Sequence, residues 1–262
     1  MNYNYVKQEV IRFNKIAKEL NMPKLYGVGG LSRDLVFSDG NLSGVNDVDL
    51  TCCDGAKTTI LGLMIGKELN GSISYFNNHC SVYIDNVKYD FSSGFVSDTI
   101  EKTGDRFKDE MLSRDFTIDS ILIDFEEDTL IDITKMGVSD IKKGIIRTVI
   151  SPKESYTSDP KRALRAIELS TRFGFKIEDI SIKYFIDNFD FFNKFHNENY
   201  KNSVSMVKKS LDNNEPETLR LLRKTKFLYQ IPLSGEFKEF IIKNNLVEEY
   251  IDNQKIIHTN II

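Results

Sequence analysis

Two aspartates stand two residues apart in the segment 47–51, which reads Asp-Val-Asp-Leu-Thr. Acidic and apolar residues alternate there, and this period of two predicts a β-strand with one polar and one buried face. Asp47 and Asp49 are therefore expected to project side by side, about 6.6 Å apart along the strand. Two such carboxylates can hold Mg²⁺ ions, which activate an attacking hydroxyl and neutralise a triphosphate. Taken alone, the pair could equally be the solvated face of an ordinary strand.

A Gly-Gly pair stands between a predicted strand, residues 25–28, and a predicted helix, residues 31–37. Glycines let a backbone approach phosphate oxygens, and the free N–H groups at a helix start attract anions. Arg33 lies one turn into this helix, where its guanidinium can point at the same anion. Gly29 and Gly30 are therefore candidates for a phosphate-binding turn, although an ordinary strand-to-helix connection has the same pattern.

The elements that must position these residues follow from the hydrophobic periodicity, which predicts an α+β fold. The first half alternates helical periods with short strands, of which three are expected as a meander at 72–76, 80–84 and 87–91. From about residue 151 the pattern changes to successive helices, expected at roughly 159–173, 178–193, 200–212 and 215–228. We take this change as a domain boundary.

The composition is that of an ordinary globular protein, with 40% hydrophobic and 28% charged residues and a net charge of −4. This charge argues mildly against a protein that coats nucleic acid without selectivity. No apolar run is long enough to span a bilayer, and the N-terminus shows no signal peptide pattern, so a cytoplasmic location without membrane contact is expected. The three cysteines are expected to be reduced structural thiols.

The order of the motifs resembles a known family. Gly29-Gly30-Leu31-Ser32-Arg33-Asp34, followed by Asp47-Val48-Asp49, is similar to the GG-x-x-RD and DxD signature of class II CCA-adding enzymes and bacterial poly(A) polymerases. These enzymes belong to the polymerase-β-like nucleotidyltransferase superfamily. Three further blocks continue the match: residues 114–118 (Arg-Asp-Phe-Thr-Ile); Ile131-Asp132 with Gly137, Asp140 and Arg147; and residues 159–166 with 173–175. The resemblance covers about residues 25–175, and five blocks in register are far more specific than any one of them.

The resemblance implies that the first blocks form the reacting site of a nucleotidyltransferase. Gly29, Gly30 and Arg33 then hold the triphosphate, whereas Asp47 and Asp49 are catalytic and bind Mg²⁺ as the cofactor.

Three more positions are implied for the same site. Arg114 and Asp115 lie in the block that contacts the sugar and phosphates of the incoming nucleotide in the family, although Asp115 is also a possible helix cap. A third catalytic carboxylate, able to accept the proton of the attacking 3′-hydroxyl, is expected on a neighbouring strand. Asp90 is the candidate, with an exposed edge position as the alternative.

Asp159, Arg162 and Arg165 fall three residues apart on a predicted helix, where they could be a solvated face. By resemblance, Asp159 and Arg162 become a protein template that reads the base edge through its hydrogen-bond donors and acceptors. Arg165 would support this pair or meet phosphate. The domains implied are a catalytic head with a mixed, mainly antiparallel sheet (1–150), a helical neck with the nucleotide-reading helix (151–180) and a short helical body that contacts RNA (181–262).

The chain departs from the family's pattern at four positions. Ser113 replaces a usual arginine, Ser158 a glutamate, Asp119 an asparagine and Glu168 a third arginine of the template helix. These changes bear on base choice and triphosphate affinity more than on the metal chemistry. About ninety residues follow the template helix, fewer than is usual in the family, from which we expect a reduced grip on tRNA.

The function implied is addition of CCA to the 3′ end of tRNA from CTP and ATP by a two-metal mechanism. The alternatives are a poly(A) polymerase acting on RNA 3′ ends, a non-catalytic RNA-binding relative, and a nucleotidyltransferase that modifies a protein or small molecule. Asp47 and Asp49 argue against the non-catalytic alternative. The sequence does not indicate an oligomeric state.

Overall fold

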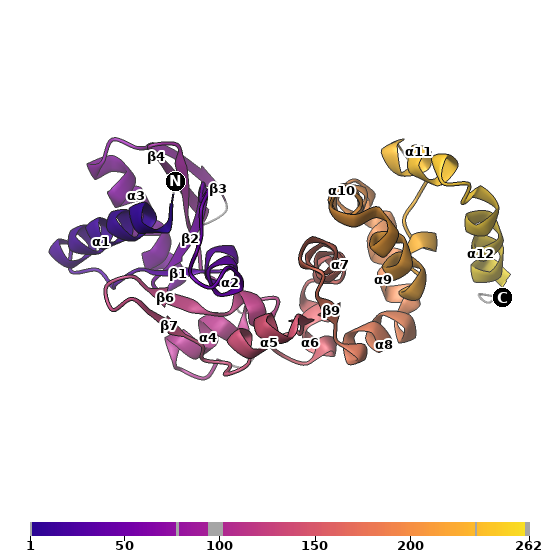
Figure 1. The fold of residues 1–262 in the computed structure, drawn as a ribbon, viewed down its shortest axis with the longest axis horizontal. Helices are drawn as coiled ribbons and strands as arrows, with labels where there is room; N and C mark the ends of the chain where they lie inside the picture. The colour runs from indigo at the N-terminus through magenta and orange to yellow at the C-terminus, as the bar shows by residue number, and fades with distance from the viewer. Residues whose placement is uncertain (1, 77–78, 94–101, 234, 260–262) are drawn as a thin grey trace. The chain divides into compact units, whose positions relative to one another are not determined.

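The computed structural model describes residues 2–76, 79–93, 102–233 and 235–259. The chain forms two compact units, which are coloured from indigo to magenta and from pink to yellow in Figure 1. The head unit comprises Met1–Lys143 with Arg147–Ile150, and the helical unit comprises Gly144–Ile146 with Ser151–Ile262.

The head unit is built on a sheet with the strand order β3-β4-β5-β2-β1-β6-β7. All neighbouring strands are antiparallel except β2 and β5, which run parallel. The mixed, mainly antiparallel sheet predicted from the sequence is thus confirmed. The strands are β1 (Tyr26–Val28), β2 (Asp47–Thr51), β3 (Ser72–Phe76), β4 (His79–Ile84), β5 (Val87–Phe91), β6 (Leu122–Asp124) and β7 (Thr129–Ile131).

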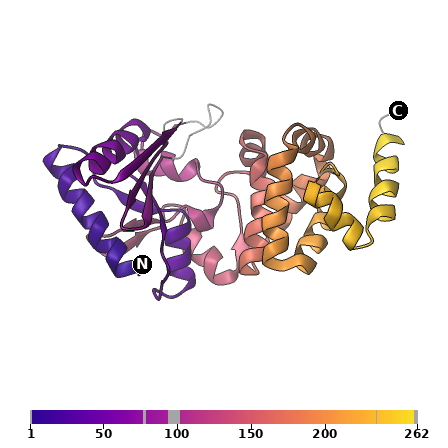
Figure 2. The same cartoon turned by 90° about the horizontal axis from the view of Figure 1, so that it is seen from above.

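One face of this sheet is covered by α1 (Tyr3–Glu19) and α3 (Gly55–Glu68); Figure 2 shows α1 lying along the sheet. Alternate residues of the strands point into the core beneath these helices, among them Val48, Leu50 and Tyr89. Phe13 of α1 packs edge to face on Tyr89, with ring centroids 4.9 Å apart. The period-2 pattern of β2 therefore buries its apolar residues under α1 and α3 and directs its aspartates to the opposite face.

The opposite face carries a smaller apolar cluster beneath α4 (Arg106–Leu112), formed by Val28, Cys53, Met111 and Leu122. Val28 pairs directly with Asp49 in the sheet, so this cluster borders the polar part of the same face. The head also contains α2 (Gly30–Phe37), η1 (Thr117–Asp119) and α5 (Gly137–Lys143).

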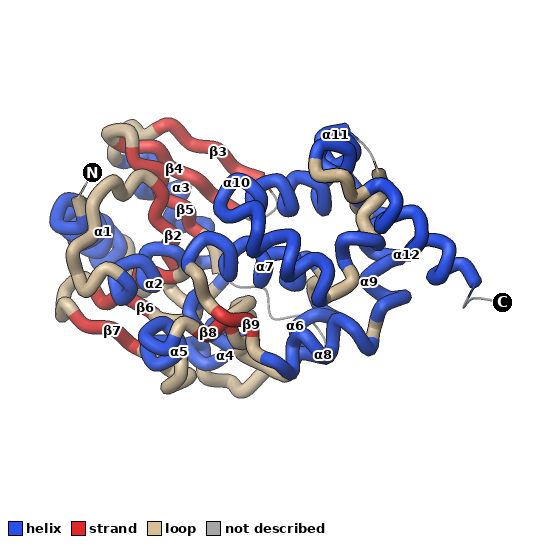
Figure 3. The backbone as a smooth tube through the Cα atoms, turned by 45° about the vertical axis from the view of Figure 1, so that its right-hand side comes forward, coloured by secondary structure: helices blue, strands red, loops and turns tan. Residues whose placement is uncertain are grey.

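The helical unit holds the helices that follow residue 151 and the two-stranded sheet β8-β9 (Figure 3). Its core contains interlocking aromatic rings, with Phe185, Phe192 and Phe227 fully buried and their centroids 5.3–5.5 Å apart. Its elements are β8 (Ile145–Ile146), α6 (Pro152–Ser158), α7 (Lys161–Phe173), β9 (Lys176–Ile177), α8 (Asp179–Asp187), α9 (Phe189–Glu198), α10 (Tyr200–Lys224), η2 (Phe227–Tyr229), α11 (Gly235–Lys243) and α12 (Val247–Thr259).

The helix bounds differ from the sequence prediction in three places. The helix expected at 178–193 is two helices, because Asn188 leaves helical geometry at φ −114° and ψ 41°. The helices expected at 200–212 and 215–228 join as α10 with a kink at Asn214, shortly before Pro216, whose ring is incompatible with the preceding turn. The helix expected from residue 159 begins at Lys161, because Asp159 precedes a proline and is extended.

Cys52, Cys53 and Cys80 are buried free thiols, as expected. No helix within the described residues is both long and apolar enough to cross a membrane.

Candidate active site

The acidic residues of the head lie in adjacent positions on the face of the sheet opposite α1 and α3. In the parallel pair β2 and β5, Asp47 is the register partner of Lys88, and Asp49 is the partner of Asp90. Ser81 of β4 is in turn the partner of Asp90. Because register partners point to the same face, three carboxylates and one ammonium group share a small area of surface.

The two aspartates of β2 differ in their surroundings. The side chain of Asp47 is 62% exposed, whereas Asp49 lies deeper, next to the glycine turn. Burial raises the pKa of Asp49; Arg114 offsets part of this effect, while the carboxylates of Asp47, Asp90 and Asp119 add to it. An excess of negative charge is thus gathered around Asp49.

The glycine turn brings the backbone against Asp49. Gly29 has φ 71° and ψ −132°, a conformation that side chains disfavour, and it is the N-cap residue of α2. A Cβ atom placed on Gly29 would lie 2.9 Å from Oδ2 of Asp49. Glycine at this position therefore lets the start of α2 approach the carboxylate of Asp49.

Arg33 is buried and directed at carboxylates of its own unit. Its Nε donates to Asp34 at 2.9 Å, and its Nη1 donates to Oδ1 of Asp119 at 2.6 Å. These acidic neighbours outweigh burial and raise the pKa of Arg33 further. Asp119 is thus the ion-pair partner of the arginine that was expected at the triphosphate, and Oδ2 of Asp119 is buried without a hydrogen-bond partner among the described residues.

Asp90 is buried in β5 and is held by three side chains. Ser81 donates to its Oδ1 at 2.5 Å, and Nε2 of His79 lies 3.2 Å from the same oxygen. Lys88 donates to Oδ2. Asp90 is therefore an oriented member of the carboxylate cluster, and the alternative of an exposed edge position is wrong.

Sequence reasoning missed these partners of Asp90. Lys88 stands two residues before Asp90 on the same strand, so the period of two could have placed it on the same face. Ser81 and His79 lie on another strand, and their positions depend on a pairing register that no local pattern reveals.

Arg114 follows α4 and forms an ion pair with the buried Glu110, one helical turn away. It is also close enough to act on the charge of Asp49. Asp115 is partly buried next to Arg114, and the following η1 takes Phe116 rather than Asp115 as its N-cap residue.

The block around Asp140 connects segments that are distant in the sequence. The buried Asp140 accepts from Thr117 at 2.7 Å and from Nε of Arg147 at 3.0 Å. A Cβ atom on Gly137 would lie 2.5 Å from the carbonyl oxygen of Thr117. Gly137, Asp140 and Arg147 therefore hold in place the segment that carries Arg114 and Asp119. Their role in this structure is to stabilise the fold.

The three residues of the expected template lie in the helical unit. Asp159 is the C-cap residue of α6 and accepts from the backbone N–H of Lys161 at 3.1 Å. Arg162 is buried in the first turn of α7 and donates to Ser155 at 3.0 Å, whereas Arg165 is exposed. The alternative of a solvated face is wrong for Arg162, because its buried guanidinium donates to Ser155 of α6.

The other departures from the family have simple local partners. Ser113 donates to the carbonyl oxygen of Glu110 at 2.6 Å, and Ser158 donates to that of Ser155 at 2.8 Å. Glu168 is partly exposed on α7. Near the C-terminal end of α10, Arg220 and Arg223 form two-pronged hydrogen bonds with Glu217 and Glu249, respectively.

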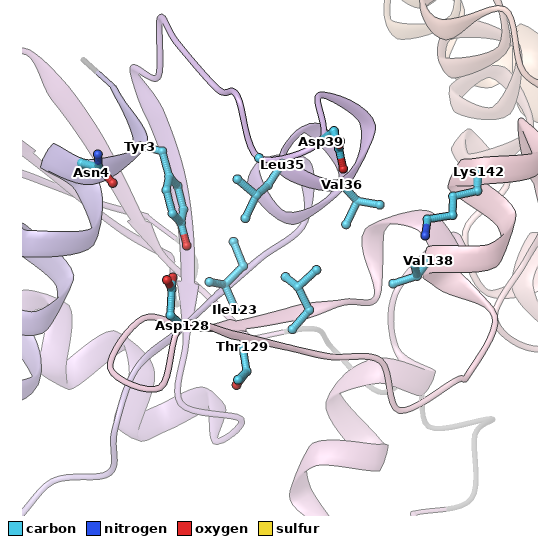
Figure 4. A pocket seen from close by; sticks show the side chains of 12 residues that line it. Tyr3, Asn4, Leu35, Val36, Asp39, Ile123, Asp128, Thr129, Val138 and Lys142 are labelled. Atoms are coloured by element: carbon cyan, nitrogen blue, oxygen red, sulfur yellow. The ribbon is translucent and has the colours of Figure 1, made fainter.

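A cavity of about 550 Å³ lies elsewhere in the head, between α1, α2, α5 and the β6-β7 hairpin (Figure 4). Its lining includes polar side chains such as Tyr3, Asp128 and Lys142, beside apolar residues such as Val36 and Ile123. Burial, with a smaller contribution from Asp128, raises the pKa of Tyr3 to about 12. The cavity contains none of the predicted site residues.

Residues 25–147 match the family model described as "Poly A polymerase head domain". This part of the chain, which forms most of the head unit, is thus similar to the head domain of poly(A) polymerases. The mitochondrial CCA tRNA nucleotidyltransferase of Candida glabrata is 34% identical over 71 residues, which are 27% of this chain and 13% of that protein. Poly(A) polymerase I of Escherichia coli is 38% identical over 64 residues, 24% of this chain and 14% of that protein.

The fold is similar to that of a solved CCA-adding enzyme. A structure of the Thermotoga maritima CCA-adding enzyme complexed with tRNA superposes with a TM-score of 0.66 at 23% identity. The likeness covers 88% of this chain and 53% of that one, so the chain spans about half the length of that enzyme.

Nucleotidyltransferases generally use divalent metal ions, and the donor chemistry of the site suits one. Asp47 and Asp49 offer hard carboxylate oxygens, and the crowding of acids around Asp49 provides negative charge that a cation would neutralise. Among the described residues, however, no group of three acidic, histidine or cysteine side chains is gathered as a set of metal ligands. The third carboxylate nearby, Asp90, is bonded to Lys88 instead.

Proposed function

We propose that this protein adds nucleotides to the 3′ end of RNA, with CCA addition to tRNA from CTP and ATP as its reaction. The observation that carries the proposal is the juxtaposition of Asp49, Asp90 and the glycine turn on one face of the head sheet. The similarity of residues 25–147 to the poly(A) polymerase head domain supports the same reaction class. Since the chain spans only part of its relatives, the activity, the substrates and the RNA partner are all inferences.

In this proposal each part of the head acts on one part of the reaction. The N–H groups at the start of α2, freed by Gly29 and Gly30, bind triphosphate oxygens. Arg33, through its bonds to Asp34 and Asp119, keeps this turn in place, and Arg114 with Asp115 contacts the nucleotide from the other side.

The transfer joins the 3′-oxygen of the RNA to the α-phosphorus of the nucleotide and releases pyrophosphate. Asp90 is oriented by Ser81 and His79 to accept the proton of the attacking hydroxyl. Asp47 and Asp49 are the residues that would hold Mg²⁺, which when bound activates that hydroxyl and neutralises the triphosphate.

The base is selected, in the same proposal, by the neck that contains Asp159 and Arg162, with Arg165 exposed beside them for support or phosphate contact. The carboxylate of Asp159 would accept from an exocyclic amine, and the guanidinium of Arg162 would donate to ring or carbonyl acceptors. The proposal assigns residues 1–150 to the catalytic head, 151–180 to the neck and 181–262 to a body that contacts RNA. It also places the protein in the cytoplasm.

The deciding experiment uses a tRNA transcript that lacks its terminal CCA. With CTP and ATP together, we expect addition of three nucleotides and then termination, read as a discrete product on a sequencing gel. With ATP alone, extension should stop without a long ladder.

A poly(A) polymerase is the second candidate, favoured by the 38% identity to Poly(A) polymerase I of Escherichia coli over 64 residues. Long ladders with ATP and no use of CTP would establish that activity in place of CCA addition. Absence of any incorporation, with the protein folded, would favour the non-catalytic RNA-binding alternative.

Replacement of Arg162 by lysine tests the template. The variant keeps the charge but loses the planar fork of donors, so relative incorporation of the four nucleoside triphosphates should change by about 10- to 100-fold. Lysine is chosen because Arg162 is buried and alanine would also disturb the bond to Ser155. Arg172→Lys, at the other end of α7, is the matched control. An unchanged preference profile in Arg162→Lys would remove Arg162 from the reading site.

A further inference from the structure

We propose that Lys88 is a built-in competitor of the divalent cation, holding Asp47 and Asp90 with its ammonium group until a cation displaces it. The inference rests on the proposed metal role of Asp47 and Asp49. It assigns a function to a residue that the family motifs quoted above do not include.

The position of Lys88 between two acids comes from the sheet register. Lys88 lies directly beside Asp47 in the parallel pair β2 and β5, two residues before Asp90. Its Nζ is 3.6 Å from Oδ1 of Asp47 and donates to Oδ2 of Asp90. One positive charge thus connects carboxylates from two strands, in the place where a cation held by both would lie.

The charge of Lys88 is maintained by its acidic neighbours. The ordinary pKa of a lysine is about 10.4, and Nζ of Lys88 lies between the carboxylates of Asp47 and Asp90. The ammonium group is therefore charged at neutral pH, and it reduces the repulsion between acids that would otherwise face each other without a counter-ion.

The two carboxylate oxygens of Asp90 have different partners, so Lys88 can be displaced without loss of the other contacts. Ser81 and His79 hold Oδ1, whereas Lys88 holds Oδ2. When Lys88 leaves, Asp90 keeps its orientation through Oδ1 and presents Oδ2 to the cluster. The side chain of Lys88 is 33% exposed, so its flexible stem has solvent into which it can move.

A divalent cation brings twice the charge of the ammonium group and prefers carboxylate oxygens, so it should replace Lys88 at sufficient concentration. Lys88 would then set the concentration of cation at which the site fills. Removing its charge should tighten cation binding, and it should also lower the stability of the protein when no divalent cation is present.

Binding of Mn²⁺ to the full chain tests this, measured by electron paramagnetic resonance of free Mn²⁺ at low salt without nucleotide or RNA. Lys88→Gln is expected to bind with a Kd about tenfold lower than the unmodified protein. Its Tm should rise more on addition of Mn²⁺. Lys88→Arg, which keeps the charge, should bind like the unmodified protein.

Lys24→Gln is the matched control, because Lys24 also joins two carboxylates in the head, Asp124 at 2.6 Å and Glu126 at 2.9 Å. Its Mn²⁺ affinity should be unchanged. Equal or weaker Mn²⁺ binding by Lys88→Gln, or equal tightening by Lys24→Gln, would overturn the role of Lys88. Absence of Mn²⁺ binding in all variants would overturn it together with the metal assignment. Normal Mn²⁺ responses without nucleotide addition would contradict the proposed reaction alone.

Discussion

Replacement of Asp49 by asparagine is expected to lower nucleotide incorporation by about 10²- to 10³-fold, the loss typical of one strong electrostatic group in an active site. The physical reason is the removal of a charge from the carboxylate cluster that is proposed to hold Mg²⁺. The measurement is single-turnover primer extension at saturating Mg²⁺. Near-normal incorporation would show that Asp49 is not a metal ligand.

The same substitution should not destabilise the protein. Burial and neighbouring acids raise the pKa of Asp49, so its ionised form is disfavoured in the folded state. The pKa of Asp49 is therefore higher in the folded protein than its ordinary value of 3.8 in the unfolded chain. As the pH rises through these two pKa values, the free energy of unfolding falls. At pH 7 the neutral Asp49→Asn should therefore unfold at the same or a higher Tm.

Asp124→Asn is the matched control with the opposite expectation. Burial by itself would raise the pKa of Asp124, but hydrogen bonds from Lys24 and from backbone N–H groups lower it below its ordinary value. The charge of Asp124 therefore stabilises the folded head at pH 7. Asp124→Asn should lower the Tm and leave the rate of incorporation unchanged. If both variants lost stability and activity together, the loss in Asp49→Asn would be one of folding.

Replacement of Gly29 by alanine should reduce incorporation by about 10²-fold or more, because a displaced backbone N–H removes a donor from the triphosphate. The new Cβ atom would lie 2.9 Å from Oδ2 of Asp49, and the φ of 71° is itself strained for alanine, so the turn or the carboxylate must move. Primer extension and urea unfolding would measure the two effects.

Gly44→Ala separates the clash from the backbone strain. Gly44 has a similar φ of 73°, and a Cβ atom there would meet nothing within 4 Å. We expect both alanines to cost about 1–3 kcal/mol of unfolding free energy through the strained φ, while only Gly29→Ala loses activity. Full activity in Gly29→Ala would mean that the glycine turn does not bind the triphosphate.

The sequence by itself determined the features that local patterns encode. The period of two in residues 47–51 placed Asp47 and Asp49 on one face, and the structure has them there. The glycine pair before a helix and the head sheet followed by helices were also evident from neighbouring residues. The order of the motifs gave the resemblance to nucleotidyltransferases. Such features depend on steric rules that act over a few residues.

Tertiary structure alone decided which groups meet at the candidate site. The bond from Arg33 to Asp119 joins residues 86 positions apart. Lys88 reaches Asp47 through the parallel pairing of β2 with β5, two strands separated in the sequence by α3, β3 and β4. Register is selected by the burial of Val48 and Leu50 under α1 and α3, a non-local contribution to the folding free energy. For that reason the pair Asp47 and Asp49 could be anticipated from the sequence, but the contact of Lys88 with Asp47 could not.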